Sequence, residues 1–458
     1  MRKTTMTKML LKNGTLLLPG RKVEKGDVLV GEDGRIAAVG NVPAEDAAGA
    51  NVRDSSGMLV MPGLVNCHGH TAMTLVRGLG GGLPLQRWLE EAIFPVEAKM
   101  KPADVKAGNV WGIIEMLAGG TTAVADMYDF PTEMAVALME AGMRGRVCRV
   151  GLSFVPGRLE DCMEFTRTHN EWIASERHED VLADLCVHSE YLTDEPFCRK
   201  LADANRELKR PVHVHVSETK KEHDECIARH GKTPIAYLAS TGLLDHGGYA
   251  AHCVWCTDDD FRIMSEHGVS LVHNPTSNMK LGSGFARVPR AMELGVNVAL
   301  GTDGCASNDN LDMFEEMHLA SLIHKGVAHD PTVLQPWDVI EMATINGAKA
   351  LGMEGRAGSI EVGKDADLVL VDLSAPHLTP CLDVPNLIVN SMHASDVVTT
   401  ILRGDPVYDR TAWRDGGKKD ESLAFRPASA LDGPPWTVED ARRDFLAAVA
   451  RLGLKVQA

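Results

Sequence analysis

The chain has 458 residues, which is enough for one large domain of about 250–300 residues and a smaller second one. Its apolar content of 44%, charged content of 24% and net charge of −16 favour a globular protein and argue against nucleic acid or an anionic membrane as a partner. No apolar run approaches roughly 18 residues, and charges interrupt the N-terminal apolar stretch. We therefore expect a cytoplasmic protein that acts on a small molecule, without a signal peptide or membrane span.

The first 61 residues have the pattern of a small β-structure. Short apolar runs alternate with turn signals, and Asn13-Gly14 predicts a turn between two strands. The same pattern returns at 358–371, and a further strand is predicted at 397–402. We expect residues 1–61 and 358–412 to form one small β-sandwich domain from both chain ends. Residues 413–458 are predicted to be a polar loop followed by a terminal helix at 437–452, which Thr437 caps.

The middle of the chain, residues 62–357, alternates between strand and helix patterns. The first of its strands begins a few residues earlier, at residue 59. Apolar strand candidates lie at 59–66, 122–126, 147–154, 182–188, 212–216, 249–254, 269–273 and 296–301. Helical patterns lie between them, for example at 85–100, 103–118, 134–141, 196–208, 258–267 and 311–325. This alternation predicts a parallel sheet buried on both faces. Eight such units predict an α/β fold of the (β/α)8 TIM-barrel type, and an open doubly wound sheet is the structural alternative.

Titratable residues mark the C-terminal ends of most of these strands. His68 and His70 end the first strand, and residues two apart on a strand point the same way. Later strands carry, at or near their ends, His188, His213, His215, Glu218, His252, His273 and Asp303. A lone histidine at a strand end is more often structural, and Asp303 alone could cap the next helix. Because catalytic groups of a barrel gather at this end, their joint occurrence predicts a metal site.

Three imidazoles and a carboxylate suit a borderline metal such as zinc. An ion with an open position lowers the pKa of its water towards about 7, and a nearby carboxylate can then move protons. The ten cysteines show no disulfide framework, so we expect reduced and mostly buried thiols. Cys253 and Cys256 have the spacing of a redox or zinc pair, but no second pair accompanies them.

Five motifs are specific enough to indicate a family. They lie at residues 62–70 (PGLVNCHGH), 214–220 (VHVSETK), 251–253 (AHC), 272–278 (VHNPTSN) and 301–304 (GTDG). Together they resemble the amidohydrolase superfamily, in its branch of purine and triazine aminohydrolases, along essentially the whole chain. Residues 83–89, 94–97, 274–284 and 307–316 are similar to the subgroup of 5'-methylthioadenosine/S-adenosylhomocysteine deaminases.

The resemblance implies a metal centre with one divalent ion per subunit, Zn²⁺ being the first choice and Fe²⁺ or Mn²⁺ the alternatives. The implied ligands are His68, His70, His215 and Asp303. Spacing alone does not separate His213 from His215. The resemblance selects His215, three residues before Glu218, and leaves His213 one layer deeper or simply structural. Binuclear relatives carry a lysine on the fourth strand, where this chain has His188, so a single ion is implied.

The implied reaction is hydrolytic deamination. Asp303 would activate a water molecule and His252 would orient it. Glu218 would protonate the ring nitrogen beside the carbon under attack, and ammonia would leave. S-adenosylhomocysteine, 5'-methylthioadenosine or adenosine would become the inosine analogue.

The resemblance also implies the substrate contacts Trp88, Glu97, Arg149, Arg158, His188, Glu218 and Asp303. Glu97 would accept hydrogen bonds from ribose hydroxyls, His188 would contact the purine, and Trp88 would line the pocket. Arg149 and Arg158 would bind the carboxylate of a homocysteine tail. A homo-oligomer is a family-level expectation. Residues 78–82 are glycine-rich without the ending of a phosphate loop, and we interpret them as a flexible lid.

Two other functions stay open on this evidence. One is a different hydrolase or deaminase on the same scaffold, acting on guanine, a pterin or a substituted triazine. The other is a metal-free binding protein on a degenerate barrel, which the complete set of ligands disfavours.

Overall fold

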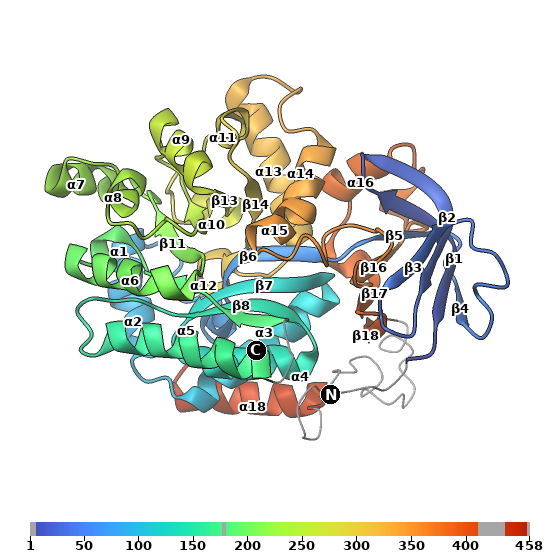
Figure 1. The fold of residues 1–458 in the computed structure, drawn as a ribbon, viewed down its shortest axis with the longest axis horizontal. Coiled ribbons are helices and arrows are strands. Elements are labelled where there is room, and N and C mark those ends of the chain that lie inside the picture. Colours follow the sequence, from blue (N-terminus) through green and yellow to red (C-terminus); the bar gives the residue numbers. More distant parts are fainter. Residues whose placement is uncertain (1–5, 176–179, 411–435, 456–458) are drawn as a thin grey trace.

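The computed structural model describes residues 6–175, 180–410 and 436–455. Both ends of the chain meet in one eight-stranded sheet, drawn in blue and orange-red on the right of Figure 1. Its order is β18-β17-β16-β5-β1-β2-β3, and β4 pairs with β1. The strands are β1 (Met9–Leu18), β2 (Lys22–Val30), β3 (Ile36–Gly40), β4 (Asn51–Asp54), β5 (Met58–Pro62), β16 (Leu368–Asp372), β17 (Val397–Leu402) and β18 (Asp405–Asp409). The predicted joining of the two ends is present as a single sheet, and the two-layer sandwich stays a prediction.

The turn expected at Asn13-Gly14 is wrong. Strand β1 runs through both residues, and the pairing of β1 with β2 shifts register between Leu11 and Gly14. Asn13 adopts φ of 63° and donates its backbone N–H to Asp27 Oδ1 at 2.8 Å. The Asn-Gly signal therefore forms a bulge within one strand, because asparagine tolerates the left-handed conformation in both settings.

The middle of the chain forms two parallel sheets of five strands each. One has the order β15-β6-β7-β8-β9 and the other the order β10-β11-β12-β13-β14. Asp184 alone separates β9 from β10, and two residues separate β14 from β15. The strands are β6 (Leu64–His70), β7 (Thr121–Tyr128), β8 (Arg144–Arg149), β9 (Val181–Ala183), β10 (Leu185–Cys186), β11 (Val212–Val216), β12 (Gly248–His252), β13 (Val269–His273), β14 (Val298–Leu300) and β15 (Asp303–Gly304).

Helices follow most of these strands and surround the two parallel sheets (Figure 1). The helices from the first to the second half of this region are α1 (Leu85–Trp88), α2 (Phe94–Glu97), α3 (Pro102–Ala118), α4 (Pro131–Ala141), α5 (Arg158–Ser175), α6 (Glu195–Leu208), α7 (Lys220–His230), α8 (Pro234–Ser240), α9 (Asp258–His267), α10 (Pro275–Lys280), α11 (Val288–Glu293), α12 (Cys305–Asn308), α13 (Met313–Ala328), α14 (Pro336–Ala343) and α15 (Ile345–Ala350). Helix α16 (Val384–Asn390) precedes β17, and α18 (Val438–Arg451) packs against α3. Short helical turns are η1 (Thr71–Val76), η2 (Leu89–Ile93), η3 (Glu190–Leu192), η4 (Pro376–Leu378) and η5 (Ala394–Asp396).

Local sequence signals explain several helix ends. Thr257 and Asp260 form a capping box at the start of α9, and Thr437 and Asp440 form one at the start of α18, as the sequence predicts. The helix expected at 85–100 is instead divided into α1, the π-helical turn η2 and α2. Pro95 lies at the first turn of α2, where proline has no backbone hydrogen bond to lose. Of the polar loop predicted to start at 413, residues 413–435 lie outside the described residues.

Gly63 is the point at which the chain passes from one sheet to another. The strand expected at 59–66 is divided there, because β5 pairs with β1 and β16 whereas β6 pairs with β7. A Cβ atom at Gly63 would lie 2.1 Å from Thr122 Oγ1, so a side chain does not fit without displacing β7. Gly63 lets β5 of the small sheet and β6, the first parallel strand, follow one another without a loop.

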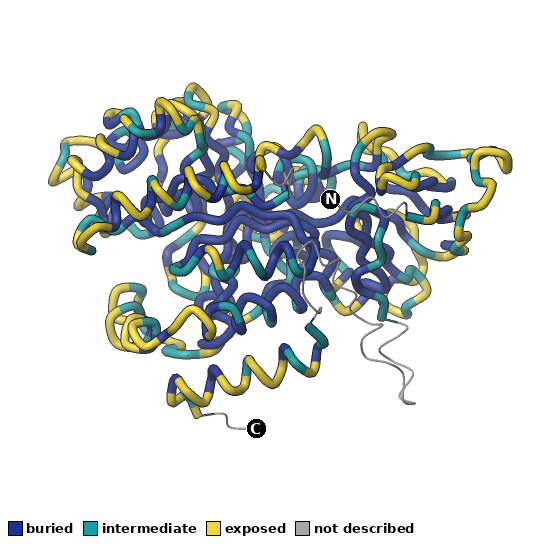
Figure 2. The backbone as a smooth tube through the Cα atoms, turned by 60° about the horizontal axis from the view of Figure 1, so that its bottom comes forward, coloured by how far each residue is buried: buried dark blue, intermediate teal, exposed yellow. Residues whose placement is uncertain are grey.

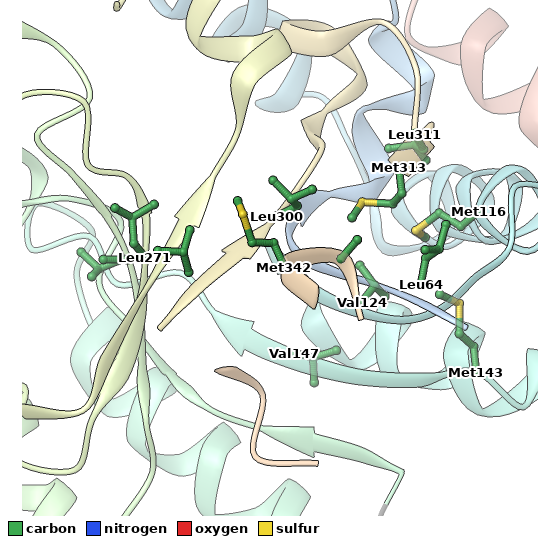
Figure 3. Packing of buried hydrophobic residues seen from close by; sticks show 14 of the residues in the cluster. Leu64, Met116, Val124, Met143, Val147, Leu271, Leu300, Leu311, Met313 and Met342 are labelled. Atoms are coloured by element: carbon green, nitrogen blue, oxygen red, sulfur yellow. The ribbon is translucent and has the colours of Figure 1, made fainter. Parts of the chain in front are cut away.

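The apolar core lies between the parallel strands and their helices. The parallel strands run through the middle of the molecule and are buried along their length (Figure 2). Figure 3 shows Leu64, Val124, Val147 and Leu300 from the strands packing with methionines from the surrounding helices and loops, Met116, Met143, Met313 and Met342. Among the described residues, no helix combines the length and the apolar character that a membrane crossing needs.

A buried arginine connects β8 to the small sheet. Arg144, whose side chain is 2% exposed, forms ion pairs with Asp180, Asp365 and Asp367, and its Nε lies 2.6 Å from Asp367 Oδ2. The third parallel strand was expected at 147–154 and is found at Arg144–Arg149, because it begins with two arginines, Arg144 and Arg146, that are buried within the strand.

Candidate metal centre and substrate cavity

Three strands bring four titratable side chains to one point. His68 and His70 come from β6, His215 from β11 and Asp303 from β15. Asp303 Oδ1 lies 3.4 Å from His68 Nε2 and 3.3 Å from His70 Nε2. The Nε2 atoms of His70 and His215 are 3.3 Å apart. The four residues that the resemblance implies as ligands therefore lie together.

His252, at the end of β12, lies beside this cluster. Its Nε2 atom is 3.9 Å from Asp303 Oδ2 and 3.9 Å from Glu218 Oε2. Within the described part of the chain, two sets of side chains have geometry that could hold a metal ion, namely His68 with His215 and His252, and His68 with His70 and Asp303. His252 is thus close enough to touch either an ion or a water molecule beside it.

The second ring nitrogen of each histidine has a partner of its own. His68 Nδ1 lies 2.7 Å from His213 Nε2, and His215 Nδ1 lies 2.7 Å from the His188 carbonyl oxygen. His70 Nδ1 contacts the Met127 carbonyl, and His252 Nδ1 lies 2.8 Å from Asn278 Oδ1. Such partners fix ring orientation and leave Nε2 for a metal. His213 consequently lies one layer below the cluster, in contact with His68.

The backbone is held in an unusual conformation at this point. His252 and Asp303 have φ of 73° and 62°, and Ser217, next to Glu218, has φ of 48°. Residues other than glycine adopt the left-handed region at a cost of about 1–3 kcal/mol each when bulky, and they cluster at functional sites. Ser277 Oγ donates to Asp303 Oδ2 at 2.6 Å, which helps to hold the carboxylate in place.

The charges of the cluster favour a cation. Burial lowers the pKa of His68 to about 4 and that of His188 to about 3, so these rings are neutral at pH 7. Burial acts against the charged form of Asp303 too, but its contacts with His68 and His70 outweigh burial and hold the pKa of this carboxyl well below its usual value. The same contact with Asp303 outweighs burial at His70 and raises its pKa to about 9. A metal ion would replace the proton on His70.

The residues present fit a divalent metal. His68 Nε2 and His252 Nε2 are buried and have no hydrogen-bond partner in the described structure, which is costly for a polar atom unless a ligand takes it up. Neutral imidazoles with one carboxylate form a donor set that suits zinc and related ions.

Glu218 is held beside the cluster by the start of α7. Glu222 accepts the backbone N–H groups of Ser217 and Glu218, each at 2.8 Å. Burial raises the pKa of Glu218 above its usual value. A carboxyl group with a raised pKa and a fixed backbone is suited to carrying a proton to and from a ligand.

These groups form the polar end of a cavity of about 460 Å³. His70, His215, Glu218, His252 and Asp303 line that end. The rest of the wall is largely apolar and includes Met73, Trp88, Met100, Leu152 and Phe154. An apolar cavity with a few converging polar groups is typical of a small-molecule site.

Four of the predicted substrate contacts outside the cluster line this cavity: Trp88, Glu97, Arg158 and His188. Trp88 donates from Nε1 to the Leu79 carbonyl at 3.1 Å, and Glu97 Oε1 accepts from the Tyr128 hydroxyl at 2.5 Å. A Cβ atom at Gly80 would lie 2.9 Å from Trp88 Cδ1, so the glycine-rich loop packs on this ring. The lid function of that loop stays a prediction.

Arg149 differs from the other predicted contacts because it does not line the cavity. Its Nη1 lies 3.1 Å from Asp129 Oδ1, and Nη2 lies 3.6 Å from Asp161 Oδ2. Arg158 begins α5, and its side chain is buried. It also binds Asp129, with Nη1 2.5 Å from Oδ1.

Sequence reasoning missed several residues of the site. Asp129, which follows β7, lines the cavity, and Glu222, Ser277 and Asn278 hold Glu218, Asp303 and His252. Asp129 could have been found by extending the search for polar strand ends to the second strand. Cys253 and Cys256 are buried and free, and their side chains are not in either potential metal set.

Residues 59–407 match the amidohydrolase family. This chain belongs to the amidohydrolase family. The match, which covers most of the chain, confirms the resemblance seen in the motifs.

Relatives and solved structures cover nearly the whole chain. It is 44% identical over 365 residues to a 5-methylthioadenosine/S-adenosylhomocysteine deaminase of Acetivibrio thermocellus, covering 80% of this chain and 84% of the relative. It is 41% identical over 404 residues to a 5'-deoxyadenosine deaminase of Methanosarcina mazei, covering 87% and 92%. A zinc-bound adenosine deaminase structure from Xanthomonas campestris aligns with a TM-score of 0.85 and 31% identity, covering 97% and 98%.

Proposed function

We propose that this amidohydrolase is a metal-dependent deaminase of adenosine-type nucleosides. It would convert the 6-amino group of S-adenosylhomocysteine, 5'-methylthioadenosine, 5'-deoxyadenosine or adenosine into the oxygen of the inosine analogue and release ammonia. The observation that carries the proposal is the meeting of His68, His70, His215 and Asp303 beside Glu218 and His252 at the polar end of one cavity. The names of the deaminase relatives support the same substrate class.

We infer that His68, His70, His215 and Asp303 hold one divalent ion, for which zinc is the first choice. When bound, such an ion lowers the pKa of a water molecule so that hydroxide is available at neutral pH. The zinc-bound structure that aligns over 97% of this chain supports this inference. Fe²⁺ and Mn²⁺ fit the same donors less closely.

The residues around the ion divide the proton transfers between them. Asp303 accepts a proton from the attacking water, and His252, 3.9 Å from Asp303 and from Glu218, orients that water. Glu218 donates a proton to the ring nitrogen beside carbon 6, so that this carbon accepts the oxygen. The proton taken up by Asp303 then passes to the amino group, the bond from carbon 6 to this nitrogen breaks and ammonia leaves, while the proton of the new hydroxyl group returns to Glu218. The raised pKa of Glu218 allows this carboxyl to hold the proton it must donate.

The remaining cavity residues suit a nucleoside. Glu97 presents a carboxylate that can accept hydrogen bonds from ribose hydroxyls, and His188 is a neutral ring in the cavity wall that could contact the purine. Trp88 and the apolar wall suit a base or a thioether.

We also propose the finer architecture that the sequence predicts. The two parallel sheets are inferred to be halves of one (β/α)8 barrel, because β9 and β10 are consecutive in the chain, as are β14 and β15. The domain boundaries at 61, 357 and 412, the β-sandwich, the homo-oligomer and the cytoplasmic location belong to the same proposal.

The test is ammonia release from a panel of substrates by the zinc-loaded protein. We expect turnover of at least one adenosyl compound and none of guanine, pterins or substituted triazines. Chelation should abolish the activity and zinc should restore it. Turnover of another heterocycle without turnover of any adenosyl compound would contradict the proposal.

A further inference from the structure

Asp129 places a carboxylate of the protein in the cavity wall, where it contacts Arg158, which also lines the cavity, and Arg149, which does not. It follows β7, lines the cavity and has a side chain that is 44% exposed. Its Oδ1 atom lies 2.5 Å from Arg158 Nη1 and 3.1 Å from Arg149 Nη1. One carboxylate oxygen thus engages both guanidinium groups.

The positive charge of the arginine pair is neutralised by the chain itself. Arg149 and Arg158 carry two positive charges, and among the residues that the structure describes Asp129 and Asp161 are the acidic groups within ion-pair distance of them. Arg158 is further fixed by donating Nη1 to the Val150 carbonyl at 3.0 Å, and its side chain is 7% exposed. Each arginine therefore already forms an ion pair within the protein, and neither is an unpaired cation that is free to bind an anionic ligand.

We propose that Asp129 is a specificity-determining residue that makes this deaminase favour nucleosides with a neutral 5' substituent over those with a carboxylate tail. The proposal rests on the proposed function. A tail carboxylate that approaches Arg158 must displace Asp129 or lie next to it, and like charges at close range oppose binding. A neutral 5' substituent, such as a methylthio or hydroxyl group or the methyl group of 5'-deoxyadenosine, carries no negative charge for Asp129 to repel. It would contact the apolar wall formed by residues such as Leu152 and Phe154.

The tail of S-adenosylhomocysteine also carries an ammonium group, which gives Asp129 a second conceivable role. If Asp129 bound that ammonium, removal of its charge would weaken binding of this substrate. The two roles predict opposite changes in the same ratio, so one experiment separates them.

The experiment measures kcat/KM for S-adenosylhomocysteine and 5'-methylthioadenosine with the wild type and Asp129→Asn, each loaded with zinc. Asparagine keeps the size of the side chain and an oxygen that can accept from the arginines. We expect the wild type to favour methylthioadenosine, and Asp129→Asn to raise the ratio of S-adenosylhomocysteine to methylthioadenosine by about tenfold. Asp129→Ser gives the same sign if the asparagine variant folds poorly.

Asp161→Asn is the matched control. It also removes a carboxylate from Arg149, but Asp161 does not line the cavity and is 57% exposed, so we expect a change below about threefold. An unchanged or lower ratio in both Asp129 variants, or a wild type that favours S-adenosylhomocysteine, would overturn the inference. Absence of turnover on either substrate would instead count against the proposed function.

Discussion

The role of His213 is decided by one contact. Its Nε2 lies 2.7 Å from His68 Nδ1, its ring packs on Tyr249, and burial holds its pKa well below the ordinary value. From spacing alone, His213 and His215 were equivalent members of a His-x-His pair. The structure places them in two layers, with His215 at the cluster and His213 supporting His68.

Replacing His213 with phenylalanine should weaken metal binding about 10–100-fold, because the His68 ring loses the partner that fixes its orientation. Competition against a chelator of known affinity measures the effect. His273→Phe is the control, since His273 is a buried histidine at the end of β13 that pairs with His324 and not with the cluster. Equal metal affinity in the His213 variant and the wild type would contradict the supporting role.

At the same scale, the sequence predicted the residues whose chemistry is unusual at a strand end. His68, His70, His215, Glu218, His252 and Asp303 could be identified because a titratable side chain ends an apolar run. Glu222 could not, because its hydrogen bonds depend on how the chain after β11 folds back. Asp129 could have been found as a polar residue after the second strand, but its ion pair with Arg158 could not. The ion pairs of Arg149 with Asp129 and Asp161 likewise could not be predicted from the sequence pattern.

At the scale of elements, the terminal helix illustrates what a pattern can and cannot reveal. The cap at Thr437 and the length of α18 agree with the prediction from the sequence. The pattern could not show where the helix packs. Ala448, Val449 and Leu452 share a buried cluster with the cavity residues Met73, Trp88 and Val105. Arg451 also pairs with the buried Asp104 of α3.

Leu452→Ala should destabilise the protein by about 2–3 kcal/mol and raise KM more than it lowers kcat, because the cavity left behind loosens the wall around Trp88. Thermal unfolding and steady-state kinetics measure the two effects. Leu446→Ala, on the same helix with its side chain exposed, should change stability by less than about 0.5 kcal/mol. A Leu452 variant as stable as the Leu446 variant would show that α18 does not support the cavity.

Strand boundaries were predicted well at Val212–Val216 and Val269–His273, which are buried along their whole length. They were wrong where tertiary contacts override the pattern. Gly63 divides one apolar run between two sheets, and the buried Arg144 and Arg146 move the start of β8. No periodicity in the sequence distinguishes a buried arginine from an exposed one.

At the scale of the whole molecule, Arg144 joins the small sheet to the parallel strands. Arg144→Met should cost about 3–5 kcal/mol of stability, because it leaves Asp365 and Asp367 buried with less compensation. Activity per folded molecule should be kept, since no described contact of Arg144 reaches the cavity residues. Chemical unfolding followed at constant zinc concentration measures the loss.

Arg21→Met is the matched control for that measurement. Arg21 pairs with Asp338 and Glu341, but its side chain is 46% exposed, so we expect a loss of about 1 kcal/mol or less. Similar losses in both variants would indicate that the Arg144 cluster does not connect the two regions. The meeting of the chain ends in one sheet could be predicted from their shared pattern, whereas this charged junction could not.

The measurement that tests the account most directly combines metal content and ammonia release in Glu218→Gln. Glu218 lies beside the proposed ligands without belonging to either potential metal set. We predict metal content equal to that of the wild type and a fall in kcat of about 10²–10⁴-fold, because glutamine cannot deliver the proton. Asp303→Asn should lose both metal and turnover. A Glu218→Gln variant that keeps its turnover, or that loses its metal, would contradict the account.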